Sequence, residues 1–164
     1  VVLSNVYLIY FTGNSLRSIR GAGPDETSTQ AYERGLRRTL ERLVAKQKKV
    51  VLVKSIPIHS VLLNVTGCAG DVRPALRREP AECLRARDAV DAERREYDAM
   101  VERVIGGLQG VHVLNTLDEL CDAQYCYINH KGVQMYIDPG HFTTAGSQLM
   151  AAALARKIED ALAP

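Results

Sequence analysis

The chain has 164 residues, 46% of them hydrophobic, which fits one domain with its own core and argues against disorder. Its net charge of +2 and its aromatic content of 5% argue against a nucleic-acid-binding surface. Because no apolar run approaches the ~20 residues that a membrane helix needs, we expect no membrane insertion of this segment.

Strand and helix patterns alternate in the first third of the chain. Residues 1–10 are mostly apolar and predict a buried strand, and residues 12–27, rich in glycine and serine, predict a loop. Ser28 or Thr29 can cap a helix. The apolar side chains of that helix fall on one stripe, formed by Tyr32, Leu36, Leu40, Leu43 and Val44. The β-branched run 50–53 is typical of a parallel strand covered on both faces.

The same alternation continues to the C-terminus. After an irregular stretch, residues 83–108 predict a long helix that ends at a group of glycines. Residues 111–114 and 133–137 predict strands, and residues 142–162 predict the terminal helix. Alternating strands and helices indicate an α/β fold with a mostly parallel sheet between two helical layers. We expect residues 1–164 to form a single domain.

Four cysteines occur in the chain, and their spacing matches neither a zinc knuckle nor a redox pair. An even number of cysteines in loops predicts two disulfides, Cys68–Cys83 and Cys121–Cys126, and therefore an oxidising compartment. The alternative is four unpaired thiols in a cytosolic protein.

Asp138 and His141 are the best candidates for chemistry, because they stand three residues apart in a tight turn. This spacing lets the carboxylate reach Nδ1–H of the imidazole, which leaves the other ring nitrogen available as a base. The alternative is a pair of ordinary turn and cap residues. No third ligand with suitable spacing indicates a metal site. The remaining histidines are isolated and fit loop or core roles: His59, His112 and His130.

The segment Tyr136-x-Asp138-x-x-His141-Phe142-Thr143-x-x-Gly146 resembles the last conserved block of the SGNH (GDSL-type) hydrolase superfamily, D-x-x-H-L-S-x-x-G. Leu120-Cys121-(x4)-Cys126 and the Arg-rich helix after Cys83 are similar to the SGNH domain fused to membrane acyltransferases of family three. Proteins of that family O-acetylate bacterial surface polysaccharides. The resemblance covers nearly the whole chain, although only the final block is strongly specific.

The resemblance implies that the nucleophile segment precedes this chain. The opening strand resembles the third block of the family, whereas the serine belongs to the first block, on an earlier strand. We therefore expect a fold that lacks its N-terminal strand and nucleophile, in the C-terminal part of a larger protein. Within the chain, Gly13-Asn14-Ser15-Leu16 offers Ser15 as a fallback nucleophile. Asn5 is the nearest candidate for the oxyanion hole, with Asn14 second.

The activity that the resemblance implies is acyl transfer through a serine ester. His141 would accept the serine proton and return it to the leaving group, while Asp138 holds the ring. The acceptor would be a carbohydrate hydroxyl or water, with no cofactor and no metal. The resemblance also implies an extracytoplasmic or periplasmic location and a membrane acyltransferase domain in the same protein. Two alternatives stay open: an inactive SGNH-like domain that binds glycan, and a cytosolic flavodoxin-like binding domain.

Overall fold

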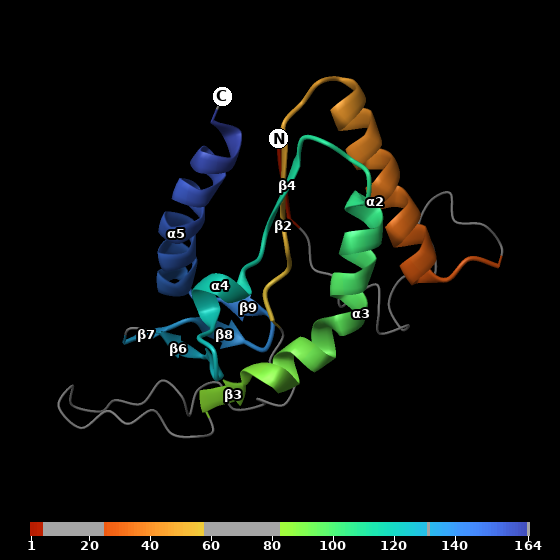
Figure 1. Cartoon of the computed structure of the whole chain (residues 1–164). Helices are drawn as coiled ribbons and strands as arrows, with labels where there is room; N and C mark the ends of the chain where they lie inside the picture. Colours follow the sequence, from red (N-terminus) through yellow and green to blue (C-terminus); the bar gives the residue numbers. More distant parts are fainter. Residues whose placement is uncertain (5–24, 58–82, 131, 164) are drawn as a thin grey trace. The chain divides into compact units, whose positions relative to one another are not determined.

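The computed structural model describes residues 1–4, 25–57, 83–130 and 132–163 (Figure 1). These residues form two compact units whose segments alternate along the chain. The sheet unit comprises Val1–Ser55, Arg94–Asn115 and Ala161–Pro164. The hairpin unit comprises Ile56–Glu93 and Thr116–Asp160. Each unit has its own hydrophobic core.

The sheet unit is built on three parallel strands in the order β1-β2-β4. These strands are β1 (Val2–Ser4), β2 (Val50–Val53) and β4 (Val111–Leu114). The central strand β2 is buried along its whole length, as expected for a β-branched strand covered on both faces. The mixed α/β fold with a parallel sheet is therefore confirmed.

Two helices contribute apolar faces to the core of the sheet unit. Helix α2 (Ser28–Ala45) begins after Thr27, one or two residues earlier than the caps expected from the sequence. The Thr27 hydroxyl accepts the Gln30 N–H at 3.2 Å, and the Gln30 side chain accepts the Thr27 N–H at 2.9 Å. The second helix is α3 (Arg87–Ile105). The buried core residues are Leu40, Val50, Leu52, Tyr97, Met100, Val101 and Val104.

The expectation that residues 83–108 form one helix is only partly correct, because α3 begins at Arg87. The preceding residues form β3 (Leu84–Ala86), which pairs antiparallel with β5 (Tyr125–Tyr127). A partner strand about forty positions away satisfies the backbone hydrogen bonds of this segment, and helical periodicity carries no signal for such a distant partner.

Short antiparallel pairs dominate the hairpin unit, which also contains the short helix α4 (Leu117–Leu120). The single strand expected at 133–137 is wrong: β7 (Val133–Gln134) pairs with β6 (Asn129–His130). Next in the chain, β8 (Tyr136–Asp138) pairs with β9 (His141–Phe142), which delays the start of the terminal helix.

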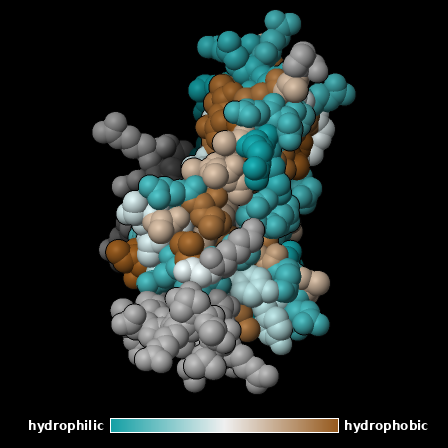
Figure 2. Space-filling view, turned by 90° about the vertical axis from the view of Figure 1, so that its left-hand side faces the viewer, coloured by the Kyte–Doolittle hydropathy of each residue, from teal (hydrophilic) through white to brown (hydrophobic). Residues whose placement is uncertain are grey.

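The terminal helix α5 (Thr144–Leu162) therefore starts two residues later than expected, because Phe142 belongs to a strand. It contributes to the core of the hairpin unit, which is formed by Cys83, Leu120, Ile128, Met135, Tyr136 and Met150. None of the helices in the described part of the chain is long and apolar enough to cross a membrane. On the face drawn in Figure 2, hydrophobic patches are interrupted by hydrophilic side chains.

Candidate functional site

The β8–β9 hairpin brings together the acid and the histidine that the sequence singles out. Asp138 ends β8, His141 begins β9, and the two are paired across a turn made by Pro139 and Gly140. The imidazole Nδ1 lies 2.9 Å from Oδ1 and 2.8 Å from Oδ2 of Asp138. The pair thus sits on an antiparallel hairpin and not on a strand of the parallel sheet β1-β2-β4.

Backbone N–H groups of the same turn stabilise the carboxylate. Asp138 Oδ1 accepts the N–H of Gly140 and the N–H of His141, each at 2.8 Å. These hydrogen bonds, that from Gly140 foremost, lower the pKa of Asp138 below its ordinary value. Because an ionised carboxylate has no proton to give, Nδ1 must be the donor in its contact with Asp138.

This arrangement leaves Nε2 as the basic nitrogen of the ring. The His141 side chain is 76% exposed, so Nε2 is accessible to another molecule or segment. Within the described residues, the ring forms its hydrogen bonds with Asp138 alone. The turn therefore holds an imidazole in a fixed orientation, with Nδ1 on Asp138 and the second ring nitrogen exposed.

Thr143 connects the hairpin to the helix that follows it. Its hydroxyl donates to the carbonyl of Gln134 at 2.7 Å and accepts the N–H of Gly146 at 2.9 Å. Its own N–H donates to the carbonyl of Met135 at 2.8 Å. Thr143 is thus the N-cap of α5, and one side chain ties that helix to the residues preceding β8.

Gly146 is required by close contact between α5 and the chain preceding β8. A Cβ atom at this position would lie 2.4 Å from the Met135 carbonyl oxygen and 2.9 Å from its Cα. Both obstacles are backbone atoms, which cannot rotate away. The glycine that ends the sequence block therefore has a packing role, and it sets where the helix lies against the segment that leads into the hairpin.

Tyr136 and Phe142 form the apolar base of the hairpin. They are paired across β8 and β9, with ring centroids 4.9 Å apart, and Tyr136 is completely buried. Ile137, the next residue of β8, faces the opposite way and is 65% exposed. Buried Tyr136 and partly buried Phe142 fix which side of the hairpin faces the core.

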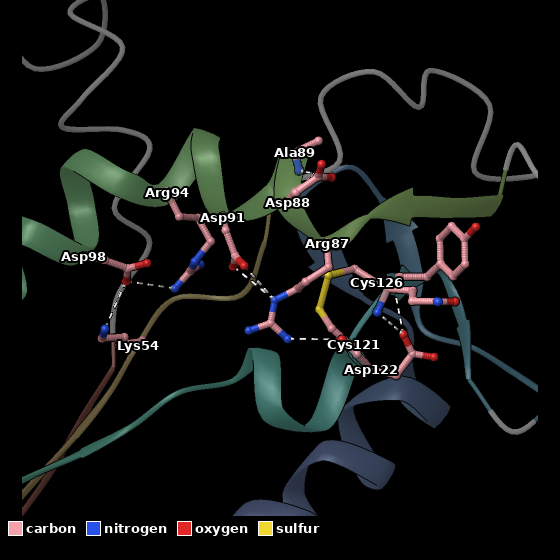
Figure 3. A network of polar contacts seen from close by, with 12 residues as sticks. Lys54, Arg87, Asp88, Ala89, Asp91, Arg94, Asp98, Cys121, Asp122 and Cys126 are labelled. Atoms are coloured by element: carbon pink, nitrogen blue, oxygen red, sulfur yellow. Dashed lines mark hydrogen bonds and ion pairs between the residues drawn. A yellow bond between two sulfur atoms is a disulfide. The ribbon is translucent and has the colours of Figure 1, made fainter.

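The expected Cys121–Cys126 disulfide is present and closes a short turn (Figure 3). Inside this turn the Asp122 carboxylate accepts the N–H groups of Gln124 and Tyr125 at 2.7 Å each, and it also accepts the Tyr127 hydroxyl. The Tyr127 hydroxyl is the main cause that lowers the pKa of Asp122. The turn is therefore held by a covalent bond and by an ionised carboxylate.

Cys83 is disulfide-bonded as well, whereas Cys68, its expected partner, lies outside the described residues. Each described cysteine thus takes part in a disulfide, which contradicts the alternative of four free thiols.

Arg87, the first residue of α3, braces the disulfide turn. Its N–H donates to the carbonyl of Gln124 at 2.8 Å. Its guanidinium contacts the carboxylate of Asp91 at 3.0 Å and the carbonyl of Asp122 at 3.4 Å (Figure 3). These contacts give one arginine of the Arg-rich segment after Cys83 a structural role.

A second polar cluster, in the sheet unit, lies where the chain leaves β2, and sequence reasoning missed it. Arg94, only 1% exposed, donates to the Ser55 carbonyl at 2.6 Å, and the Tyr97 hydroxyl accepts the Ser55 N–H at 3.1 Å. Lys54 Nζ lies 3.1 Å from Asp98 Oδ1 (Figure 3). Burial raises the pKa of Tyr97. The cluster fixes the backbone at the carboxyl end of the central strand.

The remaining candidates divide into residues outside the described ranges and two histidines within them. Asn5, Ser15 and Cys68 lie outside the described residues. His112 is exposed on β4, and His130 lines a surface pocket of the hairpin unit. Across the described ranges, no group of three or more His, Cys, Asp or Glu side chains is placed to hold a metal ion.

Comparisons with known proteins agree with this fold. A family model described as "SGNH domain (fused to AT3 domains)" matches residues 1–156. In structure the chain is similar to the periplasmic domain of a lipopolysaccharide acetyltransferase from Salmonella ser. Paratyphi A, with a TM-score of 0.59 and 15% identity. That match covers 96% of this chain and 55% of the other, so the chain spans about half the length of its structural relative. Comparison with curated protein sequences gave no match.

The family model spans nearly the whole chain and includes the β8–β9 hairpin, the disulfide turn and the parallel sheet. The structural similarity independently supports the mixed α/β fold. The chain therefore belongs to the family of SGNH domains that are fused to AT3 domains.

Proposed function

We propose that this chain supplies the acid–base pair of a serine-dependent acyltransferase that O-acetylates, or de-esterifies, a bacterial surface carbohydrate. The observation that carries the proposal is the His141 ring, whose Nδ1 is held by an ionised Asp138 and whose Nε2 is open to solvent. Membership of the SGNH family supports this reading, as does the acetyltransferase activity named for the structural relative.

In the proposed reaction His141 transfers protons and Asp138 remains ionised throughout. Nε2 takes the serine proton as the serine oxygen attacks the acyl carbonyl, and it then protonates the departing oxygen of the donor. A carbohydrate hydroxyl next gives its proton to Nε2 and attacks the serine ester, which returns the serine to its starting state. Water in place of the carbohydrate gives hydrolysis. Asp138 keeps the tautomer and stabilises the imidazolium that forms in each half-reaction.

We place the serine outside the described residues. The family resemblance assigns it to a strand upstream of the chain, and Ser15 remains the fallback within it. In the described sheet, β1 pairs only with β2 and so leaves one edge for a further strand. A parallel strand added at that edge would make β1 an interior strand of the sheet.

The setting that we propose is extracytoplasmic, in a protein that also carries a membrane acyltransferase domain. The family description names fusion to AT3 domains, and the structural relative is a periplasmic domain. The Cys121–Cys126 disulfide fits an oxidising compartment.

The test is replacement of the base in the full-length protein, with hydrolysis of 4-nitrophenyl acetate as the readout. His141→Ala should lower kcat/KM by about 10²–10⁴-fold, the usual contribution of a general base. His112→Ala is the matched control, because His112 is exposed on β4 and should leave the rate unchanged. A His141→Ala rate within a few-fold of wild type overturns the proposal.

The second candidate is an inactive domain that binds glycan. It is favoured by the His141 ring, which contacts no serine among the described residues. It would be recognised by carbohydrate binding without any His141-dependent turnover in the full-length protein.

A further inference from the structure

The hairpin unit contains an open pocket of about 460 Å³ that takes no part in the Asp138–His141 turn. Its volume lies within the range of ~300–1,000 Å³ that is typical of small-molecule sites. Its walls come from α4, the disulfide turn, β5 and β6. The lining residues are Asp118, Glu119, Cys121, Asp122, Tyr127, Asn129 and His130. We call it the Tyr127 pocket.

Hydrogen-bond acceptors dominate the polar lining of the Tyr127 pocket. Asp122 is ionised, since the Tyr127 hydroxyl and two backbone N–H groups lower its pKa. Glu119 is paired with Lys157 at 2.7 Å, whereas Asp118 lies 4.0 Å from the same ammonium group and is 52% exposed. Carboxylates in this number suit a ligand that brings several hydrogen-bond donors, such as the hydroxyl groups of a sugar.

Flat ring surfaces complement these acceptors. The rings of Tyr127 and His130 lie with centroids 5.6 Å apart and planes inclined by 53°, so that together they form a corner. A pyranose offers an apolar C–H face to such rings and hydroxyl donors to the carboxylates that line the same pocket. A metal ion is a poorer fit, since no three ligating side chains converge anywhere in the described ranges.

The pocket is also held rigid on one side. The Cys121–Cys126 disulfide closes the turn that carries Asp122, and Arg87 ties the same turn to α3. A preformed wall of this kind lowers the entropic cost of binding a small polar ligand.

We propose that the Tyr127 pocket binds a sugar ring of the carbohydrate acceptor. This inference rests on the proposed function for its biological role, but the binding that it asserts does not depend on turnover.

The test is titration of the full chain with methyl glycosides of D-glucose, D-galactose, D-mannose and L-rhamnose, followed by ¹⁵N–¹H chemical shifts. At least one glycoside should shift the amides of residues 118–130 in a saturable manner. Asp118→Asn should weaken that binding about tenfold, the effect of one hydrogen bond to a charged group. Glu159→Gln, on the exposed surface of α5, is the matched control and should bind as wild type does.

Absence of a saturable shift with all four glycosides overturns the inference, and so does equal binding by Asp118→Asn and wild type. Because this assay involves no catalysis, either failure leaves the His141→Ala experiment to decide the proposed function by itself. Conversely, full activity of His141→Ala together with glycoside binding would remove the catalytic proposal and keep the sugar site.

Discussion

Gly146→Ala should destabilise the protein even though alanine is the better helix former. The new Cβ would lie 2.4 Å from the Met135 carbonyl oxygen, where ordinary contacts are 3.4–4 Å. Overpacking costs about 1–3 kcal/mol, and a backbone obstacle places this case at the upper end. The higher helix propensity of alanine offsets about 1 kcal/mol of this cost. The free energy of unfolding should therefore fall by about 2 kcal/mol.

The site should also be disturbed, because the first turn of α5 has to move away from Met135. Such a movement lengthens the 2.9 Å hydrogen bond from the Gly146 N–H to the Thr143 hydroxyl. Thr143 directly follows the β8–β9 hairpin, so the position of His141 should change with it.

The measurement is urea unfolding followed by circular dichroism, with Gly35→Ala as the matched control. Gly35 lies within α2, and a Cβ there would meet no atom within 4 Å. That variant should gain up to about 1 kcal/mol. If Gly146→Ala proves as stable as wild type, the close contact between α5 and Met135 does not exist as described.

Three further predictions concern charge and covalent links. Asp98→Ala removes the carboxylate 3.1 Å from buried Lys54 and should cost about 3 kcal/mol in urea unfolding. Glu102→Ala is the control, because its carboxylate is 3.8 Å from Lys54 and 67% exposed, and it should cost less than ~1 kcal/mol. Equal losses of unfolding free energy in Asp98→Ala and Glu102→Ala would refute the stronger role of Asp98. Since the pKa of Asp138 is lowered in the folded state, its ionisation stabilises the protein above the ordinary value of 3.8, and this contribution is lost as the pH falls through the folded pKa. Asp138→Asn should therefore be less stable than wild type at neutral pH. If the difference in unfolding free energy between the two proteins does not narrow in acid, the hydrogen bonds described for the Asp138 carboxylate are contradicted. Cys121→Ser should lower the unfolding free energy by about 2 kcal/mol in oxidising buffer, with no difference from wild type once both proteins are reduced.

Local sequence patterns were reliable where a segment is buried by its neighbours in a regular layer. The run of β-branched residues at 50–53 predicted β2, and the apolar stripe from Tyr32 to Val44 predicted α2 to within two residues at its start. In both cases the periodicity of burial is a property of the segment itself.

Patterns failed where a distant partner decides the conformation. Leu84–Ala86 continues a helical pattern, yet it is a strand because Tyr125–Tyr127 pairs with it. Residues 133–137 look like one strand but divide between two hairpins with different partners. Short pairs of two or three residues leave too few positions for alternation to be recognised.

The candidate site shows the same division. The Asp138–His141 spacing was readable because both residues belong to one turn, and the structure places them in contact. The sequence could not predict why residue 146 must be glycine, because the reason is the close approach of the Met135 backbone to α5. The Tyr127 pocket joins α4, β5 and β6, which are individually too short to predict.

In the proposed function, His141 activates a serine that carries the acyl group. The most direct measurement is peptide mass spectrometry of the full-length protein after brief incubation with 4-nitrophenyl acetate and an acid quench. We expect a single acetylated serine in wild type, formed at least about 100-fold more slowly in His141→Ala. No acetylated serine, or acetylation at the same rate in both proteins, would contradict it.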